Sequence, residues 1–287
     1  MKAAIDIGSN SLRLLVTEEI SGKVNVLRQE VRETRLGEGF REGELTSASI
    51  ARTLDVLAQW KKELLALSLQ HPLIFATSAV RDAANQEEFV RLVKNRTGED
   101  LRILSGEEEA WYSFTGAVGG FAFPKENCLL IDIGGGSTEL AGFENGKLTA
   151  VSMPFGAVRW KVMAYRRFNV KRAMATQITL RHFDRIDHFI GVGGTVTTAA
   201  AVLGRVASYT REAVHGCVID YQTLQELKGR LSAMTLEERK QVTGMPEARA
   251  DIILYGLEIL EILFELLHMP QLYISDWGIL DGILADQ

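Results

Sequence analysis

Apolar residues along the chain fall either into short runs or into longer stretches where they recur at helical spacing. Short apolar runs bounded by polar or glycine residues are typical of buried strands, and they predict strands over residues 3–5, 73–76, 101–104, 129–131, 187–190 and 272–274. Apolar residues at helical spacing predict helices over residues 44–70, 86–95, 105–116, 197–203, 224–234, 236–242 and 249–267, with a short apolar helix at the C-terminus. The pattern indicates an α/β protein.

The N-terminal strand opens a characteristic order of elements. It leads into the motif D-I-G-S-N-S at residues 6–11, which ends in the small polar residues Ser9, Asn10 and Ser11. Two further strands, over residues 12–19 and 24–33, follow on either side of a turn at Ser21-Gly22.

The same order recurs in the second half of the chain. The strand at 129–131 leads into D-I-G-G-G-S-T-E at residues 132–139, and strands over 138–144 and 147–153 flank Asn145-Gly146. Asn-Gly is a strong hairpin signal. We interpret the repeat as a duplication whose two similar halves face each other across a cleft, with one loop on each wall.

The three consecutive glycines Gly134, Gly135 and Gly136 indicate a special turn. Glycine is costly inside a regular element, because it loses the most backbone entropy on folding. A turn with unusual φ values, which lets a ligand approach the main chain, explains them better. Successive amides in such a turn form a nest for phosphate oxygens, to which Ser137 and Thr138 add hydroxyl donors. The alternative, two tight turns with glycine for steric reasons, does not explain why an aspartate ends both strands.

Several polar residues outside these turns are candidates for the same site. Asp132 and Glu139 flank the second turn and could hold a hard cation or orient a water molecule. A third turn ends in Gly193, Gly194 and Thr195 at a helix N-terminus, where backbone amides and the helix dipole favour an anion. It matches neither the dinucleotide fingerprint nor the P-loop.

Arg81 follows the strand at 73–76, with Thr77 and Ser78 before it. Open α/β sheets bind ligands at the carboxyl ends of their strands, which favours a ligand contact for Arg81 slightly over a surface pair with Asp82.

The segment Ser105–Trp111 reads as the start of a helix with three consecutive acidic residues. Ser105 is a plausible N-cap and Glu108 its capping-box partner, so helix geometry accounts for Glu107 and Glu108. Glu109 precedes Ala110 on a face that can turn toward the cleft, which makes it a candidate catalytic residue. A break at Gly119-Gly120 predicts a domain boundary, with one domain over residues 1–119, against which residues 275–287 pack back, and a second over residues 120–274.

Composition and charge limit the class of protein. The 287 residues are enough for two domains, and 46% hydrophobic with 24% charged residues is typical of globular proteins. A net charge of −5 argues against nucleic acid as a partner. Cys128 and Cys217 form no disulfide framework or metal spacing, so we expect buried, reduced thiols. We expect no membrane span, because Glu258, Glu261 and Glu265 interrupt the longest apolar helix.

Two further features bear on localisation and substrate. Met1-Lys2 runs directly into the first strand, which predicts a cytoplasmic protein without a signal peptide. The run Arg159–Arg172 holds six basic residues and no acidic one. It is a candidate track for a polyanion, with a solvated helix face as an equally good alternative.

Seven motifs together resemble the exopolyphosphatase / guanosine pentaphosphate phosphohydrolase (Ppx/GppA) family. In order they are D-I-G-S-N-S, A-T-S-A-V-R-D-A, S-G-E-E-E-A, D-I-G-G-G-S-T-E, G-A-V-R, G-V-G-G-T and V-H-G. The resemblance runs from Ile5 to about Gly282. It implies two duplicated ribonuclease-H-like α/β domains, as in actin, sugar kinases and acetate kinase, around a phosphate-binding cleft.

The resemblance also implies roles for individual residues. Glu109 matches the catalytic base, and Glu139 and Asp132 match the acidic residues at the metal and the water. Asp6 is a third candidate for holding Mg²⁺. The expected phosphate-binding residues are Ser9, Asn10, Ser11, Arg81, Gly134, Gly135, Gly136, Ser137, Thr138, Gly193, Gly194 and Thr195.

The chain departs from the family pattern in two places. Larger members carry a C-terminal helical domain with a metal-dependent phosphohydrolase-like signature, whereas this sequence ends at Gln287 and resembles the short two-domain members. Leu280 precedes Asp281-Gly282 where many members have arginine, which puts a phosphate or domain-closure contact there in doubt.

The expected activity is Mg²⁺-dependent release of terminal phosphate from inorganic polyphosphate. Guanosine pentaphosphate (pppGpp) is the alternative substrate. A phosphotransferase and a non-catalytic nucleotide switch are further alternatives, of which the switch does not explain Glu109. We expect no nucleic-acid or membrane partner, and a homodimer is one candidate for the oligomeric state, which the sequence leaves open.

Overall fold

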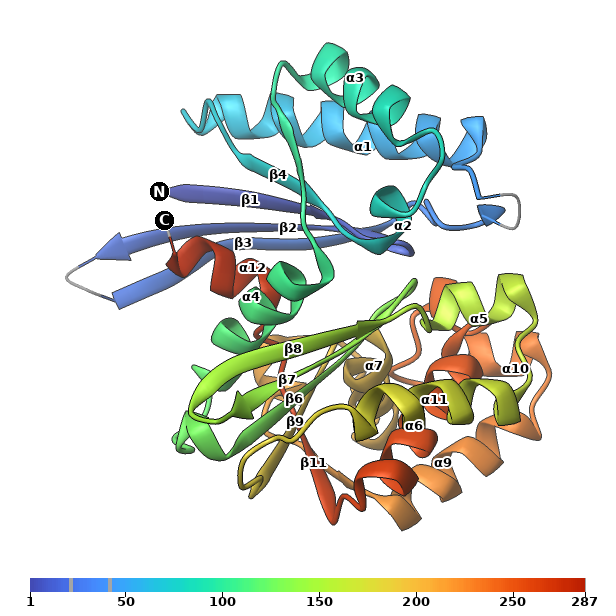
Figure 1. The fold of residues 1–287 in the computed structure, drawn as a ribbon. Coiled ribbons are helices and arrows are strands. Elements are labelled where there is room, and N and C mark those ends of the chain that lie inside the picture. The colour runs from blue at the N-terminus through green and yellow to red at the C-terminus, as the bar shows by residue number, and fades with distance from the viewer. Residues whose placement is uncertain (21–22, 41–42, 287) are drawn as a thin grey trace.

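The computed structural model describes residues 1–20, 23–40 and 43–286, so the predicted turn at Ser21-Gly22 lies outside the described residues. Within them, the strands form two sheets of five and six strands. The sheets face one another with two helices between them, α4 (Gly106–Val118) and α12 (Ile279–Ala285), as Figure 1 shows. We refer to the sheets with their outer helices as the first and second lobes.

The first lobe is built on the sheet β3-β2-β1-β4-β5. Its strands are β1 (Lys2–Ile7), β2 (Ser11–Ile20), β3 (Lys23–Glu33), β4 (Leu73–Ala76) and β5 (Leu101–Ile103). The helices α1 (Ser47–Ala66) and α3 (Gln86–Thr97) cover one face through a core that includes Trp60 and Phe89. The short α2 (Ser78–Arg81) follows β4, and α12 packs on the other face.

The second lobe is built on the sheet β10-β11-β9-β6-β7-β8. Its strands are β6 (Cys128–Ile133), β7 (Thr138–Glu144), β8 (Lys147–Met153), β9 (His188–Val192), β10 (Val218–Asp220) and β11 (Gln271–Ile274). Helix α4 covers one face. The helices of this lobe are α5 (Ala157–Met163), α6 (Arg167–Thr179), α7 (Gly194–Leu203), α8 (Arg211–Val214), α9 (Tyr221–Ser232), α10 (Leu236–Lys240) and α11 (Ile253–Leu267). All but α10 contribute buried residues to the core on the other face of the sheet. There are 3₁₀ turns at Lys125–Asn127 and Glu247–Arg249.

The predicted repeat is present down to its hydrogen bonds. In β1-β2-β3 and again in β6-β7-β8, a strand turns back through four residues into a hairpin. The Gly8 amide donates to the Ser11 carbonyl at 3.1 Å, and the Gly134 amide donates to the Ser137 carbonyl at 3.0 Å. The register pairs Asp6 with Arg13 in one copy and Asp132 with Glu139 in the other. The two copies therefore share a backbone conformation, and they differ in the charge of the residue that is paired with the aspartate.

Helices α4 and α12, which lie between the two lobes, cross each other at glycine residues. A Cβ on Gly116 would lie 2.0 Å from the Gly278 carbonyl oxygen, and one on Gly282 would lie 2.0 Å from the Tyr112 carbonyl oxygen. Only glycine allows backbones to approach this closely. Helix α4 packs on the second sheet, and α12 packs on the first. The predicted domain division at residues 119 and 120 stays a prediction.

Element boundaries differ from the predicted ones where capping or tertiary contacts decide. Helix α1 begins at Ser47 rather than at residue 44, because the Thr46 side chain accepts from the Ser49 amide and caps it. Helix α11 begins at Ile253 rather than at residue 249, after a separate 3₁₀ turn. Both cysteines are free, as predicted, but Cys217 is only half-buried. No helix within the described residues is long and apolar enough to cross a membrane.

Candidate active site

The loops after β1, β6 and β9 meet at one small cavity between the lobes. Its volume is about 50 Å³. The predicted residues that line it are Ser9, Asn10, Ser11, Glu109, Asp132, Gly134, Gly135, Gly193, Gly194 and Thr195. We call this space the phosphate cavity. The turns that the sequence placed at one site therefore come together, from both lobes, in the folded chain.

The remaining candidates are not among the residues that line this cavity. Gly136 lines a second small space together with Ser9 and Phe40, and Ser137 and Arg81 line an open groove. The Thr138 hydroxyl donates to the Phe155 carbonyl at 2.6 Å and is buried.

The glycines Gly134, Gly135 and Gly136 allow the two lobes to approach each other closely, and they do not adopt unusual φ values. None of the three has a positive φ, so that part of the prediction is wrong, whereas Gly193 has a φ of 91°. A Cβ on Gly136 would lie 2.3 Å from Ser78 Oγ. The Ser9 and Ser78 hydroxyls are 3.2 Å apart. The lobes therefore touch at these turns, and a side chain there would separate them.

Glu109 lies in the first turn of α4, which a complete capping box fixes. Ser105 accepts from the Glu108 amide, and Glu108 accepts from the Ser105 amide. Glu109 is only 8% exposed. Burial raises the pKa of Glu109 to about 7, against the opposing charge of Arg81. A carboxylate with a pKa near neutrality suits a general base.

Arg81 contacts Glu109 as well as its sequence neighbour. Its Nη1 donates to Glu109 Oε2 at 2.9 Å and to the Leu104 carbonyl at 3.0 Å. Its Nε also lies 3.6 Å from Asp82 Oδ1. Arg81 thus orients the candidate base, and its expected phosphate contact stays a prediction.

Of the other three carboxylates, Asp6 and Glu139 are fully buried and Asp132 is half-buried. Each has one polar side-chain partner among the described residues. Asp6 accepts from Arg13 Nε at 2.7 Å, Asp132 from Ser113 Oγ at 2.7 Å, and Glu139 from Ser152 Oγ at 2.6 Å. Burial raises the pKa of all three carboxyls.

The carboxylates fit a hard cation in chemistry, but they do not converge on one point. Asp6 Oδ1 and Glu139 Oε2 are buried and have no hydrogen-bond partner in the part of the chain that the structure describes, and carboxylate oxygens are the ligands that Mg²⁺ prefers. Within the described part of the chain, however, no three acidic, histidine or cysteine side chains form a ready metal cluster. The metal assignment of Asp132, Glu139 and Asp6 stays a prediction.

Two arginines of the site are absent from the predicted set. Arg13 and Arg249 both line the phosphate cavity. The Arg249 guanidinium lies against Gly194, where an added Cβ would be 1.8 Å from Nη1. No acceptor among the described residues receives a hydrogen bond from this guanidinium, and burial beside Arg13 lowers its pKa. Arg13, at the repeat position of Glu139, could have been found by aligning the two copies, whereas no local signal marks Arg249.

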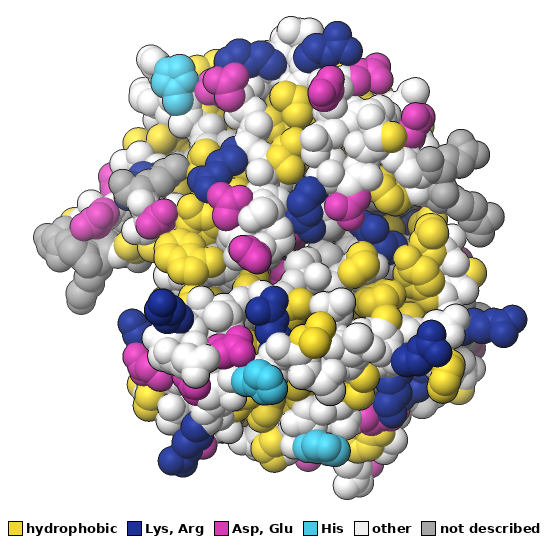
Figure 2. Space-filling view, viewed as in Figure 1, with side chains coloured by type: hydrophobic (Ala, Val, Ile, Leu, Met, Phe, Trp, Pro, Cys, Tyr) yellow, Lys and Arg dark blue, Asp and Glu magenta, His cyan; other side chains and the backbone are white. Residues whose placement is uncertain are grey.

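The basic run Arg159–Arg172 is offset by acids that are distant in sequence. Arg159 pairs with Asp82, and Lys161 Nζ lies 2.5 Å from Asp251 Oδ2. Arg167 and Lys171 pair with acids of α11, namely Glu258, Glu261 and Glu265. Acids outside the run therefore balance four of its six basic residues. Figure 2 shows one face of the molecule, on which basic and acidic side chains are interspersed.

A larger chamber of about 420 Å³ adjoins the phosphate cavity. The two spaces share Arg13, Asp132, Gly193, Gly194 and Arg249 as lining residues. The chamber wall includes two exposed aromatic rings, Tyr209 and Trp277, and the carboxylates Asp276 and Asp281. A molecule with its terminal phosphate in the small cavity could extend into this chamber.

Known proteins are similar to this chain along nearly its whole length. The sequence model of the family described as the Ppx/GppA phosphatase family matches residues 15–287. The chain is 30% identical to Exopolyphosphatase 2 of Mycobacterium tuberculosis, covering 98% of this chain and 96% of that protein. It is 29% identical to guanosine-5'-triphosphate,3'-diphosphate pyrophosphatase of Vibrio vulnificus, covering 98% of this chain and 58% of that protein.

Among solved structures, the chain is similar to the Aquifex aeolicus PPX-GPPA enzyme. The TM-score is 0.81 at 30% identity, with 99% of this chain and 98% of that one covered.

Proposed function

The chain belongs to the Ppx/GppA phosphatase family, and we propose that it hydrolyses the terminal phosphoanhydride bond of inorganic polyphosphate. The observation that carries the proposal is the phosphate cavity, where glycine turns from both lobes meet Glu109 and Arg249, whose guanidinium has no acceptor among the described residues. Backbone amides, hydroxyls and guanidinium groups are the donors that phosphate oxygens accept from. A carboxylate with a pKa near 7 in the same cavity supplies the base.

The reaction needs positioning and charge neutralisation more than covalent chemistry. A water oxygen forms a bond to the terminal phosphorus while the bond from that phosphorus to the bridging oxygen breaks. Glu109 accepts the proton of the attacking water, and the shortened chain leaves with the bridging oxygen. Arg81 holds the Glu109 carboxylate in place through the contact at 2.9 Å. General-base catalysis of this kind contributes about 10²–10⁴-fold.

Members of this family generally depend on a divalent cation. We assign Mg²⁺ to the carboxylates of Asp132, Glu139 and Asp6. The unpartnered oxygens of Asp6 and Glu139 support this assignment. Bound Mg²⁺ would neutralise charge on the phosphate oxygens.

Inorganic polyphosphate is the first candidate substrate because the exopolyphosphatase relative matches along nearly its whole length. Guanosine pentaphosphate is the second candidate, and the adjoining chamber of about 420 Å³ favours it. The chamber offers aromatic surface at Tyr209 and Trp277, on which a purine could stack. Its carboxylates Asp276 and Asp281 pair with Arg211. The paired charges of residues 159–172 give no support to that run as a polyphosphate track.

One set of assays tests the proposal. Phosphate release is measured with Mg²⁺ from long-chain polyphosphate, pppGpp and ATP side by side, with EDTA as the control and with ADP added to detect transfer. We expect metal-dependent release from polyphosphate, with pppGpp as a weaker or equal substrate. ADP-dependent transfer without phosphate release would instead make the protein a phosphotransferase. Tight ATP binding with negligible hydrolysis of all three would make it a nucleotide switch.

A further inference from the structure

The two lobes are joined by a side chain that is not among the site residues above. We propose that Arg35 is a positioning residue, which holds Arg249 in the phosphate cavity from the opposite lobe. The inference rests on the proposed function, because it concerns the same cavity. It adds that the position of Arg249, the proposed phosphate-binding cation, depends on the relative placement of the two lobes.

The backbone of Arg35 is tied to the first phosphate turn. Its amide donates to the Asn10 carbonyl at 2.8 Å, and the Gly37 amide donates to the Ser9 carbonyl at 2.8 Å. Arg35 also has a φ of 51°, a left-handed conformation that is uncommon for a residue with a long side chain. The segment 35–37 therefore forms the backing of the turn that lines the cavity.

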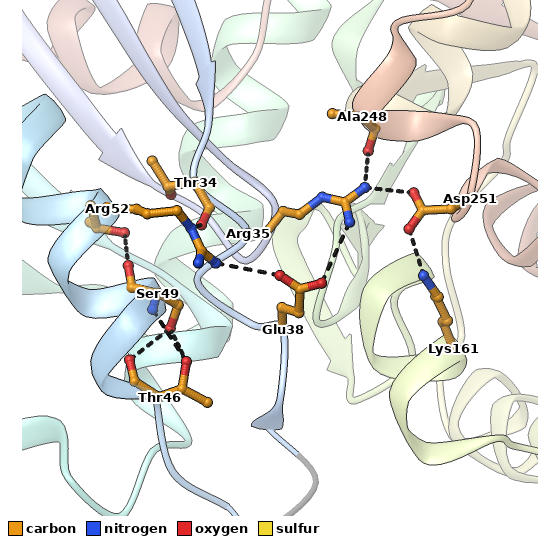
Figure 3. Close-up of polar contacts among 10 residues, drawn as sticks. Thr34, Arg35, Glu38, Thr46, Ser49, Arg52, Lys161, Ala248 and Asp251 are labelled. Atoms are coloured by element: carbon orange, nitrogen blue, oxygen red, sulfur yellow. Dashed lines mark hydrogen bonds and ion pairs between the residues drawn. The ribbon is translucent and has the colours of Figure 1, made fainter. Parts of the chain in front are cut away.

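The side chain of Arg35 reaches the other lobe on both sides of Arg249. Its Nη2 donates to the Ala248 carbonyl at 3.1 Å and to Asp251 Oδ1 at 2.9 Å (Figure 3). Asp251 in turn accepts from Lys161 Nζ at 2.5 Å through its other oxygen. The Asp251 side chain is only 13% exposed, so solvent screens this charge-assisted contact little.

Arg249 depends on such anchoring because its guanidinium has no acceptor of its own among the described residues. It belongs to the 3₁₀ turn Glu247–Arg249, which precedes α11. Its guanidinium projects over Gly194 into the cavity. Arg35 fixes the main-chain carbonyl of Ala248, directly before Arg249, and the side chain of Asp251, two residues after it, while its own backbone is fixed to Asn10. Separation of the lobes would break these contacts and release Arg249 from the phosphate position.

The test is a double-mutant cycle on equilibrium binding of inorganic tripolyphosphate. Isothermal titration calorimetry in EDTA compares the full chain with Arg35→Gln, Arg249→Gln and the double variant. We expect each single variant to weaken binding about tenfold, because a misplaced cation loses most of a charge-assisted contact. The double variant should bind no more weakly than Arg249→Gln alone. Effects that multiply, or an Arg35→Gln variant that binds like the original chain, would overturn the inference.

A matched control separates positioning from loss of charge. Arg52→Gln removes another arginine of the same network, one that contacts Glu38 and the Thr34 carbonyl without leaving the first lobe. We expect unchanged binding for this variant, and a tenfold loss would overturn the inference. Asp251→Asn, which keeps the shape of the acceptor, replaces Arg35→Gln if that variant does not fold. It should weaken binding in the same direction.

Phosphate release measured in parallel separates this inference from the proposed function. Non-additive binding without any release supports the positioning role and contradicts the proposed hydrolysis. Release with fully additive binding energies supports hydrolysis and contradicts the positioning role. A chain that binds no tripolyphosphate contradicts the positioning role whatever the release assay shows.

Discussion

Glu109 is the residue at which burial and a single cation oppose each other most directly. Burial and the nearby Asp132 and Asp6 favour the neutral acid, whereas Arg81 favours the carboxylate, and the balance places the pKa of Glu109 near 7. A base with this pKa is largely protonated below neutral pH. The activity of the free enzyme should therefore rise with pH through about 7.

Replacing Arg81 by glutamine tests this balance. Because the Arg81 charge lowers the pKa of Glu109, Arg81→Gln raises it further. The acidic limb of the profile of kcat/KM against pH should therefore move to higher pH, by about one unit or more. Arg102→Gln is the matched control, since Arg102 pairs with the neighbouring exposed Glu108 at 2.6 Å and should leave the midpoint in place. An Arg81→Gln midpoint that stays or moves down would contradict this assignment.

Single residues were predictable where the signal was local. The residues of each Asp-Ile-Gly turn, and those of the capping box at Ser105, lie within a few positions of one another in the sequence. The same reasoning assigned Gly134 to Gly136 to unusual φ values, whereas the cause is contact with Ser9 and Ser78 of the other lobe. Arg249 was not found because its place in the cavity depends on tertiary contacts alone.

At the scale of elements, the hairpins were the most predictable feature. The strands at 138–144 and 147–153 have the predicted bounds, because alternation and an Asn-Gly turn are local signals. Asn145 and Gly146 both have a positive φ, as this turn requires. Helix ends were less predictable, since a cap such as Thr46 is one of several polar residues in its segment.

The capping box of α4 should matter for both stability and activity. Ser105→Ala removes a cap and should cost about 0.5–2 kcal/mol of unfolding free energy. It should also lower kcat, because Glu109 lies in the same first turn. Thr235→Ala removes the equivalent capping box of α10. We expect this control to lose similar stability and to keep its kcat, as measured by chemical denaturation and phosphate release. An equal fall of kcat in both variants would mean that destabilisation alone lowers activity.

The contact between α4 and α12 depends on glycine. Gly282→Ala would place a Cβ 2.0 Å from the Tyr112 carbonyl oxygen, which should destabilise the protein by about 1–3 kcal/mol as the helices shift apart. Gly229→Ala is the control, because an added Cβ on this helical glycine meets nothing within 4 Å. It should stabilise the protein by up to about 1 kcal/mol. Thermal unfolding distinguishes the two, and a neutral Gly282→Ala would show that the helices tolerate separation.

At the scale of the whole molecule, the contacts between lobes lay beyond sequence reasoning. The lobes are joined by Arg35 with Asp251 and by Arg159 with Asp82, pairs that are far apart in the chain and carry no local pattern. The same is true of Arg167 with the acids of α11, which is why the basic run looked unpaired. The duplication and the common cavity could be predicted, because each half carries its own copy of the motif.

The central claim is that both lobes hold a terminal phosphate while Glu109 activates water. Glu109→Gln tests it most directly, because glutamine keeps the size of the side chain and removes the base. We predict a fall in kcat for phosphate release from long-chain polyphosphate of at least about 10²-fold, with the Kd for tripolyphosphate changed by less than about threefold. Turnover close to that of the unaltered chain, with the same metal and substrate, would contradict the account.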